Sequence, residues 1–172
     1  NGCQITGHEF FEHFFFSFTC DKVCRNGKQG TVYLGHRVAD EFGVAIKVLD
    51  QYFSNTGTAT RHRFNSREVA NLRLLRSKHV PKLLDYDLSE TGYLIMERAP
   101  GLTLHDWLRQ DVLFNGALGR SLMRDSFEAL AAVQKNEIVH QDIAPKNISV
   151  HIRHQDARVW LLDFGLSKLV GA

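Results

Sequence analysis

The sequence predicts an α+β fold in which strands fill the first part of the chain and helices follow. Residues 31–34 and 44–49 are β-branched and apolar, with glycines at the breaks, which is typical of strands. Residues 60–77 change period, because apolar side chains recur there at helical spacing among arginines and asparagines. This order favours two segregated lobes, a β-rich N-lobe over about residues 1–98 and an abbreviated helical C-lobe over about 99–172.

The remaining elements are placed by breaker residues and by periodicity. Ala99-Pro100-Gly101 indicates a loop, and Thr103 is a suitable N-cap for a short helix through Arg109. We expect strands at residues 82–87, 93–97, 148–152 and 158–162, and a longer apolar-striped helix over 118–135.

Composition is that of a small globular protein. With 172 residues, of which 44% are hydrophobic, the chain can form one domain over residues 1–172. Lysine and arginine number 21 against 19 acidic residues, and a net charge of +2 indicates neither a nucleic-acid nor a membrane partner. The phenylalanine-rich run at residues 10–18 is shorter than the roughly 20 apolar residues that span a bilayer. We expect a monomer.

The cysteines indicate a reducing, cytosol-like compartment. Cys3, Cys20 and Cys24 are an odd, clustered set, which is atypical of a disulfide framework. A zinc site that combines Cys20 and Cys24 with His8 and His13 is an alternative, although these spacings match no tight ligand pair at both ends.

Two motifs lie in the strand-rich half. Gly27 and Gly30 flank a turn between strands, where glycine lets the backbone approach phosphate oxygens, although a plain hairpin would look the same. Val44-Ala45-Ile46-Lys47 ends a buried run on a lysine, whose charge must be paired, face a ligand or reach solvent. Glu68 is the one acidic residue of the helix at 60–77 and a suitable partner for Lys47.

Two further motifs lie in the second half. His140, Asp142 and Asn147 belong to a polar loop bounded by apolar runs, where a carboxylate and an amide can lie beside a metal ion and a substrate hydroxyl. Asp163-Phe164-Gly165 follows a buried strand. Taken singly, each of these motifs is also compatible with a structural turn.

Together, the four motifs and Glu68 resemble the signature set of protein kinases in order and in spacing: glycine loop, V-A-I-K, helix glutamate, H-x-D-x-x-x-x-N and D-F-G. The resemblance covers residues 23–168, and its most specific part runs from His140 to Gly165. It implies a two-lobed kinase-like fold, the cofactors ATP and Mg²⁺, and a protein substrate.

The resemblance implies a role for each matching residue. Asp142 would orient the acceptor hydroxyl and take its proton, Lys47 would hold the α- and β-phosphates and pair with Glu68, and Asn147 and Asp163 would hold magnesium. Nucleotide contacts are implied for Gly27, Lys28, Gly30, Val32, Ala45, Lys47, Met96, Glu97, Ala99 and Asn147.

Several positions depart from the family pattern. Arg25 replaces the first glycine of the loop, Gln141 replaces an arginine that normally pairs with a phosphorylated activation loop, and Ala144 replaces a lysine that contacts the γ-phosphate. Seven residues follow Gly165, too few for an activation segment. We therefore expect an enzyme that is active without loop phosphorylation.

This trimming resembles the small type III secreted effector kinases that pathogenic bacteria deliver into host cells, which implies a host protein as substrate and the host cytoplasm as destination. Serine or threonine is favoured over tyrosine as the acceptor. Two alternatives stay open: a small-molecule or sugar kinase, favoured by Ala144, and a non-catalytic nucleotide-binding scaffold.

Overall fold

A computed structural model describes residues 18–27, 30–49, 58–88, 92–110, 114 and 116–171. The chain divides into two compact units. The first contains the described residues up to Ser66 together with Leu83–Arg98, and the second contains Arg67–Lys82 and the residues from Ala99 onward. Lys28 and the side chains of the alternative zinc site (His8, His13, Cys20 and Cys24) lie outside the described part.

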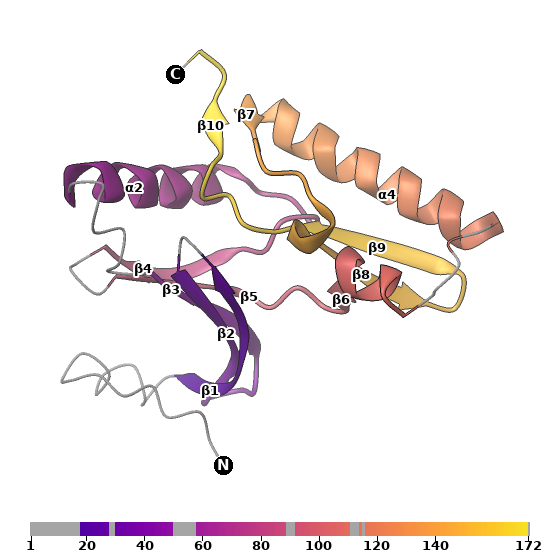
Figure 1. Cartoon of the computed structure of the whole chain (residues 1–172), viewed down its shortest axis with the longest axis horizontal. Coiled ribbons are helices and arrows are strands. Elements are labelled where there is room, and N and C mark those ends of the chain that lie inside the picture. Colours follow the sequence, from indigo (N-terminus) through magenta and orange to yellow (C-terminus); the bar gives the residue numbers. More distant parts are fainter. Residues whose placement is uncertain are drawn as a thin grey trace. The chain divides into compact units, whose positions relative to one another are not determined.

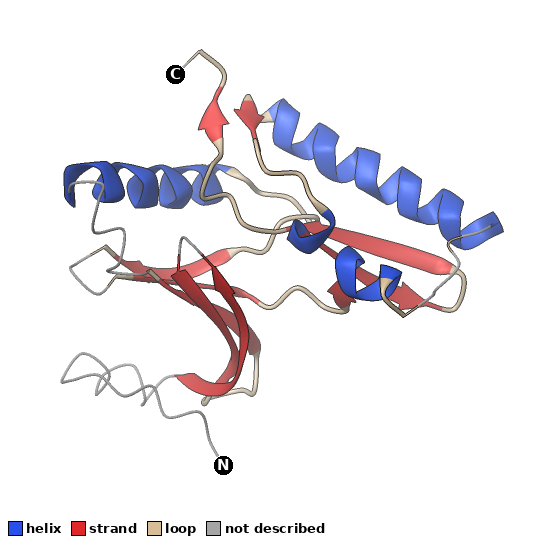
Figure 2. Cartoon of the chain, in the orientation of Figure 1, coloured by secondary structure: helices blue, strands red, loops and turns tan. Residues whose placement is uncertain are grey.

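The first unit is built on a curled antiparallel sheet of five strands in the order β1-β2-β3-β5-β4 (Figure 1). Up to residue 49, the described chain contains strands and connecting loops without a helix (Figure 2). The strands are β1 (Phe18–Gly27), β2 (Gly30–Arg37), β3 (Gly43–Val48), β4 (Leu83–Asp87) and β5 (Tyr93–Glu97).

The central strand β3 alternates between the two faces of the sheet. Val44 and Ile46 are fully buried and form a core cluster with Ile95 of β5. Ala45 and Lys47 point to the opposite face, because successive side chains of a strand alternate.

The hairpin between β1 and β2 pairs Gly27 with Gly30. Gly30 has a φ of 136°, and a Cβ atom there would lie 2.2 Å from the carbonyl oxygen of Val48. Only glycine therefore fits this close approach of β2 to the end of β3.

The helix α2 (Thr58–Leu74) connects to both units, and its residues from Arg67 onward belong to the second. Val69 and Leu72 are buried, as is Leu75 just after the helix. These residues form the apolar stripe that the helical spacing predicted.

The second unit contains two small antiparallel sheets. Three strands pair in the order β6-β8-β9, and two pair as β10-β7. The strands are β6 (Leu102–Thr103), β7 (Ile138–Val139), β8 (Ile148–Arg153), β9 (Asp156–Leu161) and β10 (Lys168–Leu169).

Two helices complete the second unit. In α3 (Leu104–Leu108), the hydroxyl of Thr103 accepts a hydrogen bond from the backbone N–H of Asp106 at 3.1 Å and so caps the helix. The longer α4 (Gly116–Lys135) lies along β9 (Figure 1). Two buried polar side chains of α4 bind the backbone of β9: Ser121 Oγ accepts from Ala157 N at 2.8 Å, and Asp125 Oδ2 accepts from Val159 N at 2.6 Å.

The structure confirms the α+β class and each strand and helix expected from the sequence, with boundary shifts of a few residues. The strand expected at residues 158–162 starts earlier, at Asp156, and ends at Leu161. Leu162 still donates its backbone N–H to the carbonyl of Asn147 at 2.8 Å, but Asn147 belongs to the 3-10 turn Pro145–Asn147 and not to β8. The two-residue strands β6, β7 and β10 were not predicted. No helix in the described ranges is long and apolar enough to cross a membrane.

Candidate active site

Asn147 and Asp142 form the centre of the polar loop that leads into β8. Asn147 ends a single 3-10 turn (Pro145–Asn147) and is 1% exposed. Its amide nitrogen Nδ2 donates to the backbone oxygen of Asp142 at 2.9 Å and to Asp142 Oδ2 at 2.8 Å. Because both amide hydrogens are directed at Asp142, the amide oxygen is the Asn147 atom that a cation could bind.

His140 fixes the other side of this loop. Its Nε2 donates to the carbonyl oxygen of Leu162 at 2.9 Å, and its Nδ1 accepts from the backbone N–H of Asp142 at 3.3 Å. Both ring nitrogens of the neutral imidazole are therefore used. Burial is the main reason that the pKa of His140 is lowered, and the Leu162 carbonyl and the nearby carboxylates of Asp163 and Asp142 offset part of this effect.

Asp163 lies just after β9, beside the loop that holds Asn147. Its φ of 60° is in the left-handed region, which is uncommon for a residue other than glycine and is often found at functional sites. The next residue, Phe164, is 1% exposed and packs on the His140 ring with centroids 4.6 Å apart. The Asp-Phe-Gly segment is thus anchored to the loop that carries Asp142.

A further buried contact holds the segment after Phe164. Ser167 donates its backbone N–H to the carbonyl of Phe164 at 2.9 Å, and its hydroxyl accepts a 2.8 Å hydrogen bond from Asn71 of α2. Asn71 and Ser167 are both nearly fully buried. This pair was not predicted from the sequence.

The oxygen donors of Asn147 and Asp163 fit the magnesium ion that the sequence predicted. Mg²⁺ prefers hard oxygen ligands such as carboxylates and amide carbonyls. Both residues belong to the second unit, and the hydrogen bond from Leu162 to Asn147 ties their two segments together.

Lys146 lies beside the candidate base Asp142 and was not predicted from the sequence. Its Nζ lies 3.8 Å from Asp142 Oδ2, and its side chain is 51% exposed. Ala144, two residues earlier, has no charge where the family pattern has a lysine. A basic residue at 146 beside a candidate base at 142 was the signal that could have identified it.

In the first unit, four predicted nucleotide-binding residues share one face of the sheet. Val32 pairs with Lys47, and Ala45 pairs with Met96. Directly opposed residues point to the same face of an antiparallel pair, and Ala45 and Lys47 are two positions apart on β3. Gly30 begins the adjoining strand β2.

The remaining predicted site residues lie at strand ends or in different units. Gly27 ends β1, Glu97 ends β5 in the first unit, and Ala99 opens the long segment of the second unit. Lys47 and Glu68 are both buried, with 4% and 2% exposure. Lys47 belongs to the first unit and Glu68 to the second, and their pairing stays a prediction.

Gln141 lies between His140 and Asp142 and directs no charge into the loop. It is exposed and has a φ of 65°. The position that carries arginine in the family pattern is therefore occupied here by a neutral side chain in a left-handed conformation.

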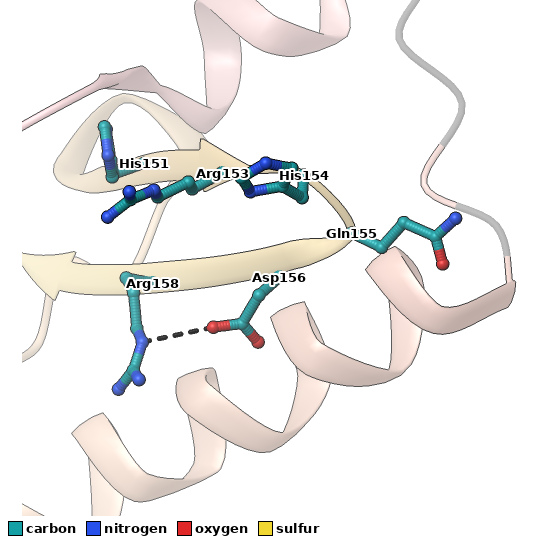
Figure 3. Close-up of a pocket in the computed structure, with 6 residues that line it drawn as sticks. All are labelled: His151, Arg153, His154, Gln155, Asp156 and Arg158. Atoms are coloured by element: carbon teal, nitrogen blue, oxygen red, sulfur yellow. Dashed lines mark ion pairs between the residues drawn. The ribbon is translucent and has the colours of Figure 1, made fainter.

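An open cavity of about 650 Å³ lies at the turn between β8 and β9, lined by His151, Arg153, His154, Gln155, Asp156 and Arg158 (Figure 3). Asp156 forms an ion pair with Arg158 at 3.3 Å. The cavity is at the opposite end of β8 from Asn147, roughly 20 Å away along a six-residue strand. It is not part of the candidate active site.

Comparison with known proteins agrees with this geometry. A family model described as a protein kinase domain matches residues 19–172. The chain is 31% identical to the serine/threonine-protein kinase Pkn1 of Myxococcus xanthus over 158 residues, which are 91% of this chain and 22% of that protein. It is 32% identical to the serine/threonine-protein kinase PknL of Mycobacterium tuberculosis over 151 residues, 86% of this chain and 36% of that protein. The chain thus spans about a fifth to a third of these relatives.

The lowered pKa of His140 predicts a dependence of stability on pH. Below the ordinary histidine pKa of about 6.5, the unfolded chain binds a proton that folded His140 does not, so the free energy of unfolding falls as the pH drops. Above about pH 6.5, this contribution is fully present. His140→Phe should remove this part of the pH dependence and lower stability at neutral pH by about 1–3 kcal/mol, because the Leu162 carbonyl loses its donor.

Urea unfolding of both proteins between about pH 5 and about pH 8, without nucleotide or metal, measures the difference. If the free energy of unfolding depended on pH in the same way in wild type and in His140→Phe, the pH dependence could not come from His140.

Proposed function

The chain belongs to the protein kinase family, and we propose that it transfers the γ-phosphoryl group of ATP to a hydroxyl of a protein substrate. The observation that carries the proposal is the arrangement of Asp142, Asn147 and Asp163. A candidate base, an amide and a second carboxylate are held by two segments that are hydrogen-bonded to each other. This is the set that positions an acceptor hydroxyl and magnesium in phosphoryl transfer.

In the proposed reaction, the acceptor oxygen bonds to the γ-phosphorus while the bond to the β–γ bridging oxygen breaks, and ADP leaves. Asp142 orients the hydroxyl and takes up its proton. Lys47 binds the α- and β-phosphates, and the sheet face with Val32, Ala45 and Met96 holds the adenine. Magnesium, when bound by Asn147 and Asp163, would neutralise charge on the phosphates.

Serine or threonine is the proposed acceptor. The relatives named above are serine/threonine-protein kinases, which supports this choice over tyrosine. Ala144 favours one rival, a small-molecule kinase, because the family lysine at this position is absent.

We propose that Lys146 supplies the positive charge that Ala144 cannot. Its ammonium lies close enough to Asp142 to reach the same space as an acceptor and a γ-phosphoryl group. An exposed ion pair at 3.8 Å adds little stability, typically below about 1 kcal/mol, so a structural role gives little reason for a lysine here.

We also propose that turnover does not require phosphorylation of the segment after Gly165. Gln141 supports this, because a neutral residue cannot pair with a phosphorylated loop. Three finer hypotheses rest on the sequence alone: the cysteine set favours a reducing compartment, we expect a monomer, and the resemblance to type III effector kinases implies secretion and a host protein as substrate.

Asp142→Ala and Asp163→Ala should impair the enzyme in different ways. Asp142→Ala should lower turnover by about 100-fold or more and leave ATP binding nearly intact, because its role is at the acceptor. Asp163→Ala should also weaken nucleotide binding in the presence of magnesium, because it removes a metal ligand.

Transfer from labelled ATP to proteins of a cell lysate measures turnover, and calorimetry with and without magnesium measures binding. Wild-type turnover in both variants would disprove the catalytic assignment, and label in the small-molecule fraction would favour the rival function.

Prior phosphatase treatment of the enzyme should leave the initial rate of phosphoryl transfer unchanged. A fall in that rate of about tenfold or more would reject phosphorylation-independent activity.

Lys146→Ala should lower kcat by about tenfold or more, because charge developing near Asp142 in the transition state loses its partner. Lys146→Arg should restore much of the rate, and Lys135→Ala, on the exposed last turn of α4, is the matched control. Steady-state kinetics with purified acceptor decides whether Lys146 acts in the transition state or only forms a structural ion pair. Unchanged kcat in Lys146→Ala would show that the ion pair is only structural.

A further inference from the structure

A buried histidine faces two carboxylates away from the candidate active site. His79 lies in the turn after α2, and Asp125 and Glu128 lie on α4, all within the second unit. The side chains of His79 and Asp125 are 5% and 2% exposed, and that of Glu128 is 46% exposed. One ligand atom from each residue lies within 4.8 Å of the others.

The hydrogen bonds of His79 determine which ring nitrogen carries the proton. Nδ1 lies 3.0 Å from the carbonyl oxygen of Val159, which can only accept, so Nδ1 carries the hydrogen. In the neutral ring, Nε2 then presents its lone pair. Nε2 is buried and has no hydrogen-bond partner, which is a costly state for a polar atom.

This lone pair faces a negatively charged group. Nε2 is 3.4 Å from Glu128 Oε2, and two electron-rich atoms at this distance repel unless a cation or a proton lies between them. Zinc bonds of roughly 2.0–2.2 Å to nitrogen and oxygen at a tetrahedral angle separate the two ligand atoms by about 3.4 Å. The observed spacing of 3.4 Å matches two ligands of one zinc ion, and the experiment below distinguishes this from a shared proton.

The surroundings of His79 also match a metal-binding histidine. Histidines that bind metals usually donate their other ring N–H to a backbone carbonyl or a carboxylate, which fixes the ring. Here Nδ1 bonds to Val159, and Asp125 Oδ2 lies 3.5 Å from the same nitrogen. Imidazole together with carboxylates suits zinc, whereas magnesium prefers oxygen ligands alone.

The net charge of the cluster favours binding of a divalent cation. Asp125 and Glu128 are the two acidic groups of the cluster, and Lys78 Nζ lies 3.1 Å from Glu128 Oε2. Lys78 is 64% exposed and can turn to solvent when a metal ion takes its place.

We propose that His79 Nε2 and Glu128 bind a zinc-type divalent metal ion, with water completing the coordination and Asp125 supporting the imidazole from its Nδ1 side. The ion clamps the turn after α2 to α4. The backbone oxygen of His79 accepts from Leu161 N at 2.8 Å, two residues before Asp163, so the clamp stiffens the support of the candidate active site.

The experiment uses the untagged, chelator-treated full chain and titrates zinc against a competing chelating dye. Wild type should bind one equivalent more than Glu128→Gln, a change at a half-exposed position that leaves folding intact. Zinc should raise the unfolding midpoint of wild type by several degrees and that of Glu128→Gln much less. Glu137→Gln, which alters an exposed carboxylate beyond α4, is the matched control and should behave like wild type.

Cobalt supplies a direct spectroscopic readout, since four-coordinate Co²⁺ with a histidine ligand absorbs visible light. The bands should appear in wild type and in Glu137→Gln and be lost in Glu128→Gln and His79→Gln. Equal binding and equal bands in wild type and Glu128→Gln would overturn the proposal, because any metal then binds elsewhere. The absence of zinc binding to wild type would overturn it as well and leave a protonated His79 as the explanation.

Discussion

The two hydrogen bonds from the Asn147 amide to Asp142 are the interaction on which the candidate active site depends. They orient the carboxylate of Asp142 and direct the amide oxygen of Asn147 away from it. Asn147 can do this because it is nearly fully buried and its own backbone accepts from Leu162. A single residue, through its side chain and its backbone carbonyl, thereby links the candidate base to the segment that carries the candidate metal ligand Asp163.

Further contacts within the second unit hold the two linked segments in place. His140 bridges the Asp142 backbone and the Leu162 carbonyl, and Phe164 packs on its ring. Behind them, Asp125 of α4 binds the backbone of β9 at Val159. Buried polar groups of this kind cost free energy when one partner is lost, so these contacts make the loop conformation specific.

The sequence predicted those elements that carry a pattern long enough or chemically specific enough to be recognised locally. The β3 run and the cap at Thr103 carry local periodic or chemical signals, and both were predicted correctly. The two-residue strand β7 is too short for periodicity, and its pairing with β10 depends on a contact distant in sequence. His79 was missed because its neighbours Asp125 and Glu128 are distant in sequence and are brought close by folding, whereas Lys146 is only four residues from Asp142 and carried a local signal that was not used. The roles of the site residues stay predictions.

The most direct measurement is a double-mutant cycle on the free energy of unfolding with Asp142→Ala, Asn147→Ala and the double variant. If the Asn147 amide holds the Asp142 carboxylate, the two changes are coupled, and the double variant loses about 1–3 kcal/mol less than the sum of the single ones. Additivity within about 0.5 kcal/mol would contradict the account, because it would mean that the two side chains do not interact in the folded protein.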